Sequence, residues 1–220
     1  MMKTLKRYIG RKMRAPVWYQ NRSFLADHAE YFKGEVIDLG CDRTKYKSFI
    51  LSVPGVTSYL GVDFYRTEKV DEVVDLNKPL PFENDRFGAA ISISVMEHLL
   101  EPQIFLDETG RILKSGGYFF ISTPWIFPYH GEPYDYFRYS RAALEYMLGK
   151  AGFEIVYCAT TGGKTRILAN QFLRWLPRFG KLKPLIERWL LVFKTNRQAY
   201  NEIAGNNLST PSHHVIARKK

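Results

Sequence analysis

The chain has 220 residues, 45% of them hydrophobic, which is enough for one well-packed core and too little for two large domains. We therefore expect a single domain over residues 1–220. Two cysteines exclude a disulfide scaffold, and no long apolar stretch follows the basic start, so we expect a protein of the reducing cytoplasm. The longest apolar run, residues 189–193, is far shorter than the roughly 20 residues that span a membrane.

The net charge of +10 is concentrated in two flanking segments. Residues 1–26 carry seven basic and no acidic side chains, and residues 162–200 carry nine basic and one acidic. Residues 27–161 are acidic overall, with twenty acidic against thirteen basic side chains. The charge pattern therefore indicates two separate basic surfaces for an anionic partner.

Short apolar or β-branched runs alternate with stretches of helical periodicity along the chain. This alternation is typical of a doubly wound α/β fold, in which helices cover both faces of a mostly parallel sheet. Helices are expected at residues 22–32, about 103–113 and 141–150, the last between a Ser140 N-cap and Gly152. Seven strands are expected, at residues 36–39, 58–62, 73–75, 89–93, 118–122, 154–160 and 213–217.

The alternation is interrupted before the last strand. Residues 164–194 predict two amphipathic helices, separated by Pro177, Gly180 and Pro184. We therefore expect a helical insertion over residues 162–208.

Polar residues follow the first two expected strands, where open α/β sheets bind their ligands. The first strand ends in Asp38-Leu-Gly-Cys41. A glycine there lets the backbone approach a ligand, and the preceding carboxylate can hold a ligand ammonium group. The second strand ends in Gly61-Val-Asp63, where a carboxylate can accept hydrogen bonds from both hydroxyls of a ribose.

These and later motifs resemble the type 11 branch of class I S-adenosylmethionine-dependent methyltransferases, from about residue 34 to 160. The resemblance implies the Rossmann-like fold of seven strands and S-adenosylmethionine as the cofactor. The motifs are Asp38-Leu-Gly-Cys, Gly61-Val-Asp63, Asp75 before Leu80-Pro-Phe82, Asn84-Asp-Arg-Phe87, Met96-Glu-His-Leu99 and Arg111-Ile-Leu-Lys-Ser-Gly-Gly117.

The resemblance also implies roles around the cofactor. Gly40 would lie under its methionine part, Asp38 near its amino group and Asp63 against its ribose. Cys41 would be a small packing residue rather than a nucleophile. The further expected contacts are Asp75 and Leu76 at the adenine, and Ser94 and Glu97 after the fourth strand.

Asp42 departs from the family pattern, because the family usually has a second glycine there. Its charge would lie near the place expected for the cofactor carboxylate and would lower the affinity. Turning outward toward Arg43, Lys45 or solvent would remove this cost.

The acceptor is expected beyond the fourth and fifth strands. Methyl transfer from a sulfonium is an in-line displacement, so the enzyme aligns the acceptor and takes its proton if it is a hydroxyl. His98 and His130 follow these strands, and either imidazole can act as a base at neutral pH. His98 has a second interpretation, as a side chain that holds the cofactor loop in place.

The segment Tyr129–Tyr139 is rich in groups that stack on a polar ring and hydrogen-bond to it. It resembles a methyltransferase subgroup found among bacterial genes for surface polysaccharides and lipid-linked saccharides. Asp135 and Arg138 are therefore candidate catalytic residues with the two histidines. In the alternative interpretation, Asp135 and Arg138 pair with each other while Tyr134, Tyr136 and Phe137 cover the cofactor.

The basic flanks have three interpretations. Cations alternate with apolar residues over residues 3–14 and stand beside tryptophans in the insertion, which suits an anionic membrane surface. RNA is a second partner that clustered cations and aromatics suit. In the third, the insertion roofs the active site or forms a dimer contact.

We expect O-methylation of a saccharide or saccharide-lipid hydroxyl by a cytoplasmic enzyme that contacts the inner membrane face. The alternatives are an RNA or small-molecule methyltransferase, and a partner protein that lost turnover through Asp42. Methylation of a base amine is disfavoured, because Ser94-Val-Met-Glu replaces the prolines usual in such enzymes. The five histidines are not at ligand spacing with carboxylates or cysteines, so no metal is expected.

Overall fold

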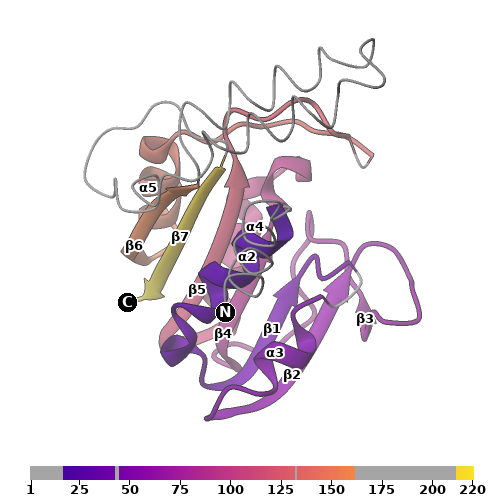
Figure 1. Ribbon diagram of the computed structural model, residues 1–220, viewed down its shortest axis with the longest axis vertical. Coiled ribbons are helices and arrows are strands. Elements are labelled where there is room, and N and C mark those ends of the chain that lie inside the picture. Colours follow the sequence, from indigo (N-terminus) through magenta and orange to yellow (C-terminus); the bar gives the residue numbers. More distant parts are fainter. Residues whose placement is uncertain (1–16, 43–44, 132, 162–211) are drawn as a thin grey trace, which may run out of the picture.

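The computed structural model describes residues 17–42, 45–131, 133–161 and 212–220. Its strands form one sheet in the order β3-β2-β1-β4-β5-β7-β6 (Figure 1). Neighbouring strands are parallel, except that β7 is antiparallel to β5 and to β6. This confirms the doubly wound, mostly parallel, seven-stranded fold. The strands are β1 Gly34–Leu39, β2 Val56–Asp63, β3 Glu72–Val73, β4 Phe87–Ile93, β5 Leu113–Pro124, β6 Phe153–Thr161 and β7 Ser212–Lys219.

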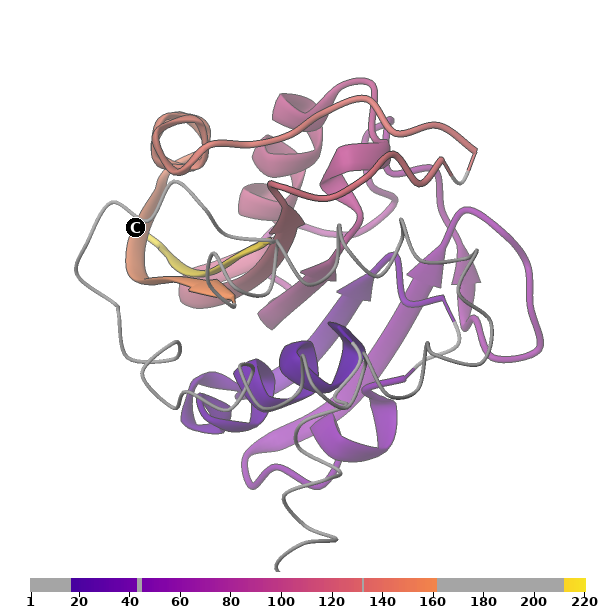
Figure 2. The same cartoon turned by 45° about the horizontal axis from the view of Figure 1, so that its top comes forward.

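Helices cover both faces of the sheet (Figure 2). On one face, α2 (Val17–Ala26) and the short α3 (Lys47–Ile50) contribute Phe24, Leu25 and Ile50 to one buried cluster. On the other face, α4 (Pro102–Ile112) and α5 (Arg141–Lys150) contribute to a second cluster. Alternate strand residues feed the two clusters, since Val36 belongs to the first and Ile37 to the second.

The two later helices confirm their predictions, α5 at both ends and α4 to within one residue. The Ser140 hydroxyl accepts a hydrogen bond from the Ala143 N–H at 3.2 Å, as an N-cap does. Gly152 has φ +82°, the left-handed conformation that ends a helix.

The predicted helix at residues 22–32 is wrong at both ends. The observed α2 begins at Val17 and ends at Ala26, and the 3-10 helix η1 (Ala29–Tyr31) follows. His28 leaves the helical conformation, and its Nδ1 lies 2.9 Å from the Phe24 carbonyl oxygen, where it satisfies a carbonyl of the last turn. Its ring also packs against Tyr157 of β6, with centroids 4.3 Å apart, so a tertiary contact overrides the local pattern.

The third strand is shorter than the predicted residues 73–75. It ends at Val73, and Asp75 begins a turn in which its Oδ1 accepts the Asn77 N–H at 3.0 Å. The sequence patterns also missed α3 and the 3-10 helix η2 (Met96–His98) that follows β4.

Most of the basic N-terminal segment and all of the insertion at 162–208 lie outside the described residues. Among the described residues, no helix is long and apolar enough to span a membrane.

Candidate functional site

Gly40 directly follows β1 at the carboxyl edge of the sheet, in a conformation that favours glycine. Its φ is +84°, and a Cβ added to it would lie 2.4 Å from Val95 Cγ2. Its N–H donates to the Val62 carbonyl at 2.9 Å, which ties the loop to β2. The first loop of the sheet therefore depends on the absence of a side chain here.

Asp42 keeps the backbone shape that a glycine would take. Its φ is +50°, a left-handed conformation that aspartate tolerates better than most residues. Its carboxylate contacts Lys45 Nζ at 2.5 Å, which is one of the outward orientations expected from the sequence. Its N–H donates to Asp63 Oδ2 at 2.8 Å, so the residue also joins the ends of β1 and β2.

Asp63 ends β2 with its carboxylate held by two backbone groups. Oδ2 accepts from Asp42 and Oδ1 accepts the Tyr65 N–H at 3.2 Å. These hydrogen bonds fix the carboxylate at the edge where the sequence predicts a ribose.

Asp38 is the second-last residue of β1 and is buried. Tyr59 donates to its Oδ2 at 2.6 Å. The pKa of Asp38 is raised to about 7. Burial is the main cause and the charge of Asp63 adds to it, while the hydrogen bond from Tyr59 acts in the opposite direction. Burial and the charge of Asp38 also raise the pKa of the Cys41 thiol to about 12, so Cys41 stays protonated, as a packing residue would.

The structure also describes Leu76 and Ser94, two further residues that were expected to contact the cofactor. Leu76 is buried in the core, directly after Asp75. Ser94 follows β4 with φ +58°, and its N–H donates to the Ser122 carbonyl at 2.8 Å. Their contacts with a cofactor stay predictions.

A second group of residues forms where the segment 127–139, after β5, folds back onto η2. The Tyr136 N–H donates to the Glu97 carbonyl at 2.7 Å, and the Tyr139 hydroxyl donates to the Met96 carbonyl at 2.9 Å. His98 Nδ1 lies 2.6 Å from the Tyr134 carbonyl oxygen. These contacts hold the segment over the end of β4.

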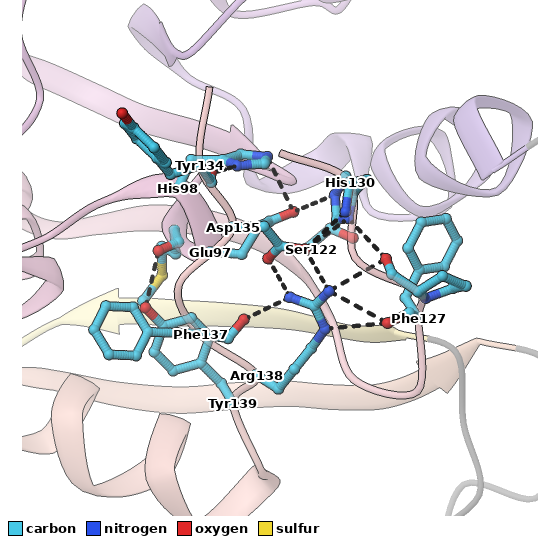
Figure 3. A network of polar contacts seen from close by, with 12 residues as sticks. Glu97, His98, Ser122, Phe127, His130, Tyr134, Asp135, Phe137, Arg138 and Tyr139 are labelled. Carbon is cyan, nitrogen blue, oxygen red and sulfur yellow. Dashed lines mark hydrogen bonds and ion pairs between the residues drawn. The ribbon is translucent and has the colours of Figure 1, made fainter. Parts of the chain in front are cut away.

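Asp135 and Arg138 pair with each other inside this segment (Figure 3). Both guanidinium NH groups of Arg138 donate to the Asp135 carboxylate, and Arg138 also donates to the Phe127 carbonyl at 3.2 Å. The Asp135 side chain is buried, and its hydrogen bonds from Arg138 hold its pKa well below the usual range. The structure therefore confirms that Asp135 and Arg138 pair with each other, while the covering of a cofactor by the neighbouring aromatic rings stays a prediction.

Glu97 and His98 of η2 lie close to His130 of the segment 127–139 (Figure 3). Glu97 Oε1 lies 3.5 Å from His130 Nε2 and 3.9 Å from His98 Nε2. The Glu97 carboxylate raises the pKa of His130, opposed by partial burial of the ring. The sequence placed Glu97 with the cofactor and both histidines with the acceptor. The structure places one ligand atom of each of the three side chains within 4.8 Å of the others, and their roles toward cofactor and acceptor stay predictions.

Comparison with known families identifies the enzyme class. Residues 10–157 match the family model described as a methyltransferase domain, which is more than half of the chain. The chain belongs to the methyltransferase-domain family. For this methyltransferase, the assignment confirms the enzyme class predicted from the sequence and supports S-adenosylmethionine as its cofactor. No curated protein matches the chain.

Solved structures of methyltransferases share the fold of this methyltransferase. An S-adenosylmethionine-dependent methyltransferase from Mesorhizobium loti has 15% identity and a TM-score of 0.63, over 94% of this chain and 100% of that one. One from Archaeoglobus fulgidus has 17% identity and a TM-score of 0.61, over 95% and 97%. Phosphoethanolamine N-methyltransferase 2 from Haemonchus contortus, in complex with S-adenosyl-L-methionine, has 17% identity and a TM-score of 0.57, over 92% and 52%.

The residues at the ends of β1 and β2 fit such a cofactor. The positive φ of Gly40 and Asp42 turns the loop at the strand ends, and the Asp42 carboxylate is engaged by Lys45. Asp63 presents a fixed carboxylate for a ribose, and Asp38 offers a carboxyl group for an ammonium.

Proposed function

We propose that this methyltransferase methylates a hydroxyl group of a saccharide or of a lipid-linked saccharide. The observation that supports the proposal is the segment 127–139, which presents exposed aromatic rings beside two imidazoles. Tyr129 is 70% exposed and Tyr134 is 59% exposed, and Tyr136 and Phe137 are also exposed. Exposed aromatic rings next to polar groups are suited to stack on a sugar ring and to hydrogen-bond its hydroxyls.

The cofactor half of the proposal assigns roles to the edge residues. S-adenosylmethionine supplies an electrophilic methyl group when bound. Asp63 would hold the ribose, Asp38 the ammonium group and Gly40 would lie under the methionine part. The remaining proposed contacts are Cys41, Asp75, Leu76 and Ser94.

The acceptor half of the proposal concerns the residue that removes the proton of the acceptor hydroxyl. The acceptor oxygen forms a bond to the methyl carbon, the carbon–sulfur bond breaks, and the hydroxyl proton must leave. His98 and His130 both turn Nδ1 toward a backbone carbonyl, which leaves Nε2 toward the Glu97 side. An imidazole nitrogen with a free electron pair in this place can take the proton. Asp135 and Arg138 act as positioning residues for His130, since Asp135 Oδ2 accepts the backbone N–H of His130 at 3.0 Å.

The proposed membrane contact rests on the sequence alone. The cations of residues 3–14 support a peripheral contact with an anionic membrane on the cytoplasmic side, where a lipid-linked acceptor would be reached. Flotation of the protein with anionic vesicles, dependent on residues 1–14, tests this contact.

The substrate proposal is tested by transfer of a labelled methyl group to free saccharides, lipid-linked saccharides and RNA. Labelled saccharide is expected, and label in RNA alone would overturn the proposal. Tyr136→Ala should raise the KM for the saccharide about 3- to 10-fold, since such aromatic contacts contribute roughly 0.5–1.5 kcal/mol, and should leave the affinity for S-adenosylmethionine unchanged.

Tyr146→Ala is the matched control for this variant. Tyr146 is a 72% exposed tyrosine on α5, outside the segment 127–139. Its replacement should leave the KM unchanged. Equal effects of the two variants would contradict a sugar-stacking role for the segment.

A further inference from the structure

The Glu97 carboxylate is the least satisfied polar group that we find near the site. The side chain is fully buried, and neither oxygen accepts a hydrogen bond from any described residue. The His130 Nε2 at 3.5 Å is too distant for a well-directed hydrogen bond. An ionised carboxylate in this position is costly unless a positive charge lies beside it.

Two imidazoles are already oriented toward this carboxylate. A carbonyl oxygen can only accept a hydrogen bond, so His98 Nδ1 must donate to the Tyr134 carbonyl, 2.6 Å away. His130 Nδ1 has acceptors on the same side, the Pro128 carbonyl at 3.2 Å and Asp135 Oδ2 at 3.1 Å. Each ring therefore keeps its Nε2 for the space beside Glu97.

This is the arrangement in which proteins hold histidine ligands of a metal. A ligating histidine usually donates its other ring N–H to a carbonyl or carboxylate, which fixes the tautomer and the ring orientation. One ligand atom from each of Glu97, His98 and His130 lies within 4.8 Å of the others. An ion among them would bring a positive charge to the buried carboxylate.

We propose that Glu97, His98 and His130 form a binding site for a divalent transition-metal ion of the Zn²⁺ class. Two imidazole nitrogens and one carboxylate suit Zn²⁺, Co²⁺ or Mn²⁺, whereas Mg²⁺ prefers oxygen ligands. Three protein ligands leave at least one coordination position open, as in catalytic zinc sites. The site goes against the sequence-based expectation of no metal, which rested on spacing along the chain.

The position of the site gives the ion a role that rests on the proposed function. The three ligands lie on η2 and on the segment 127–139, where the acceptor is proposed to lie. An ion held there would take the acceptor hydroxyl at its open position and lower the pKa of that hydroxyl, so that the proton would pass to water instead of to an imidazole.

The test uses the full chain after treatment with a chelator. Calorimetric titration with Zn²⁺ should show one ion bound per chain, and Co²⁺ should give the visible absorption of a bound ion. Glu97→Gln and His130→Asn should each weaken Zn²⁺ binding by at least about tenfold. Millimolar Mg²⁺ should not compete.

His28→Asn is the matched control, because His28 lies on another face, where its ring packs against Tyr157. It should bind Zn²⁺ like the unmodified chain. All variants are also titrated with S-adenosylmethionine, which reports the folded cofactor site separately from the metal.

Two results would overturn the metal site. One is no Zn²⁺ binding by a chain that binds S-adenosylmethionine. The other is unchanged Zn²⁺ binding by Glu97→Gln, which would leave the cluster as an ion pair of Glu97 with a protonated imidazole. Loss of S-adenosylmethionine binding by the unmodified chain would instead count against the proposed function.

Discussion

The two halves of the site are built in different ways. The proposed cofactor half, at the ends of β1 and β2, is shaped by backbone geometry within short motifs, as Gly40 and Asp42 show with their positive φ angles. The acceptor half is assembled from contacts between η2 and a segment that follows the next strand. There, side chains of Glu97 and His130 meet only because the segment folds back.

This difference explains why the cofactor is supported by the family assignment while the acceptor is a proposal. A strand end and its loop can be recognised from a few consecutive residues. A site for the acceptor depends on how a long segment packs, so function has to be argued from its geometry.

The largest expected effect is that of Gly40→Ala in the cofactor half. The added Cβ would lie 2.4 Å from Val95 Cγ2, and the backbone of residue 40 has a φ of +84°, which alanine rarely adopts. The variant should therefore lose roughly 2–5 kcal/mol of unfolding free energy or shift the loop. Binding of S-adenosylmethionine should be lost in either case. Denaturant unfolding and calorimetry measure the two quantities.

Gly116→Ala provides the matched control. Gly116 also has a positive φ, +75°, but a Cβ there has no atom within 4 Å. It should cost only about 1–2 kcal/mol and leave cofactor binding intact. If both variants behave alike, the close approach of Val95 is not what requires Gly40.

In the acceptor half, Asp135→Asn should loosen the segment 127–139. It leaves the Arg138 side chain, which is 24% exposed, without its buried charge partner and should cost roughly 3 kcal/mol. Glu145→Gln breaks the exposed Arg141 pair and should cost about 0.5 kcal/mol or less. Thermal unfolding measures which of the two variants loses more stability.

The affinity for S-adenosylmethionine should change little in Asp135→Asn. A large loss of affinity would show that the two halves of the site are not independent.

The titration of Asp38 should make the stability of the fold depend on pH. Its pKa rises from 3.8 to about 7 on folding, so the folded chain holds this proton more tightly than the unfolded chain. The contribution to stability is fully present below about pH 4 and is lost as the pH rises through 7. Asp38→Asn keeps an acceptor for Tyr59 and should remove this part of the pH dependence. Unfolding curves from pH 5 to 8 would contradict the account if both proteins showed the same slope.

The sequence predicted the sheet and the helices on both of its faces, because periodicity is local. The cofactor edge that the strand-end motifs indicate stays a prediction. It misplaced α2, since the packing of His28 against Tyr157 is a tertiary contact. It predicted the pairing of Asp135 with Arg138 as one of two interpretations, beside a catalytic role for both residues. It did not foresee that Glu97 faces His98 and His130, because neighbouring residues in a 3-10 turn do not reveal where their side chains point.

The most direct test of the central claim is calorimetric titration of the full chain and of Asp63→Ala with S-adenosylmethionine. The account predicts binding by the unmodified chain and a loss of about 100-fold or more in the variant, since each hydrogen bond to a charged group contributes roughly 1.5–3 kcal/mol. Equal affinities for the two proteins, or no binding by the unmodified chain at millimolar ligand, would contradict a cofactor site at the ends of β1 and β2.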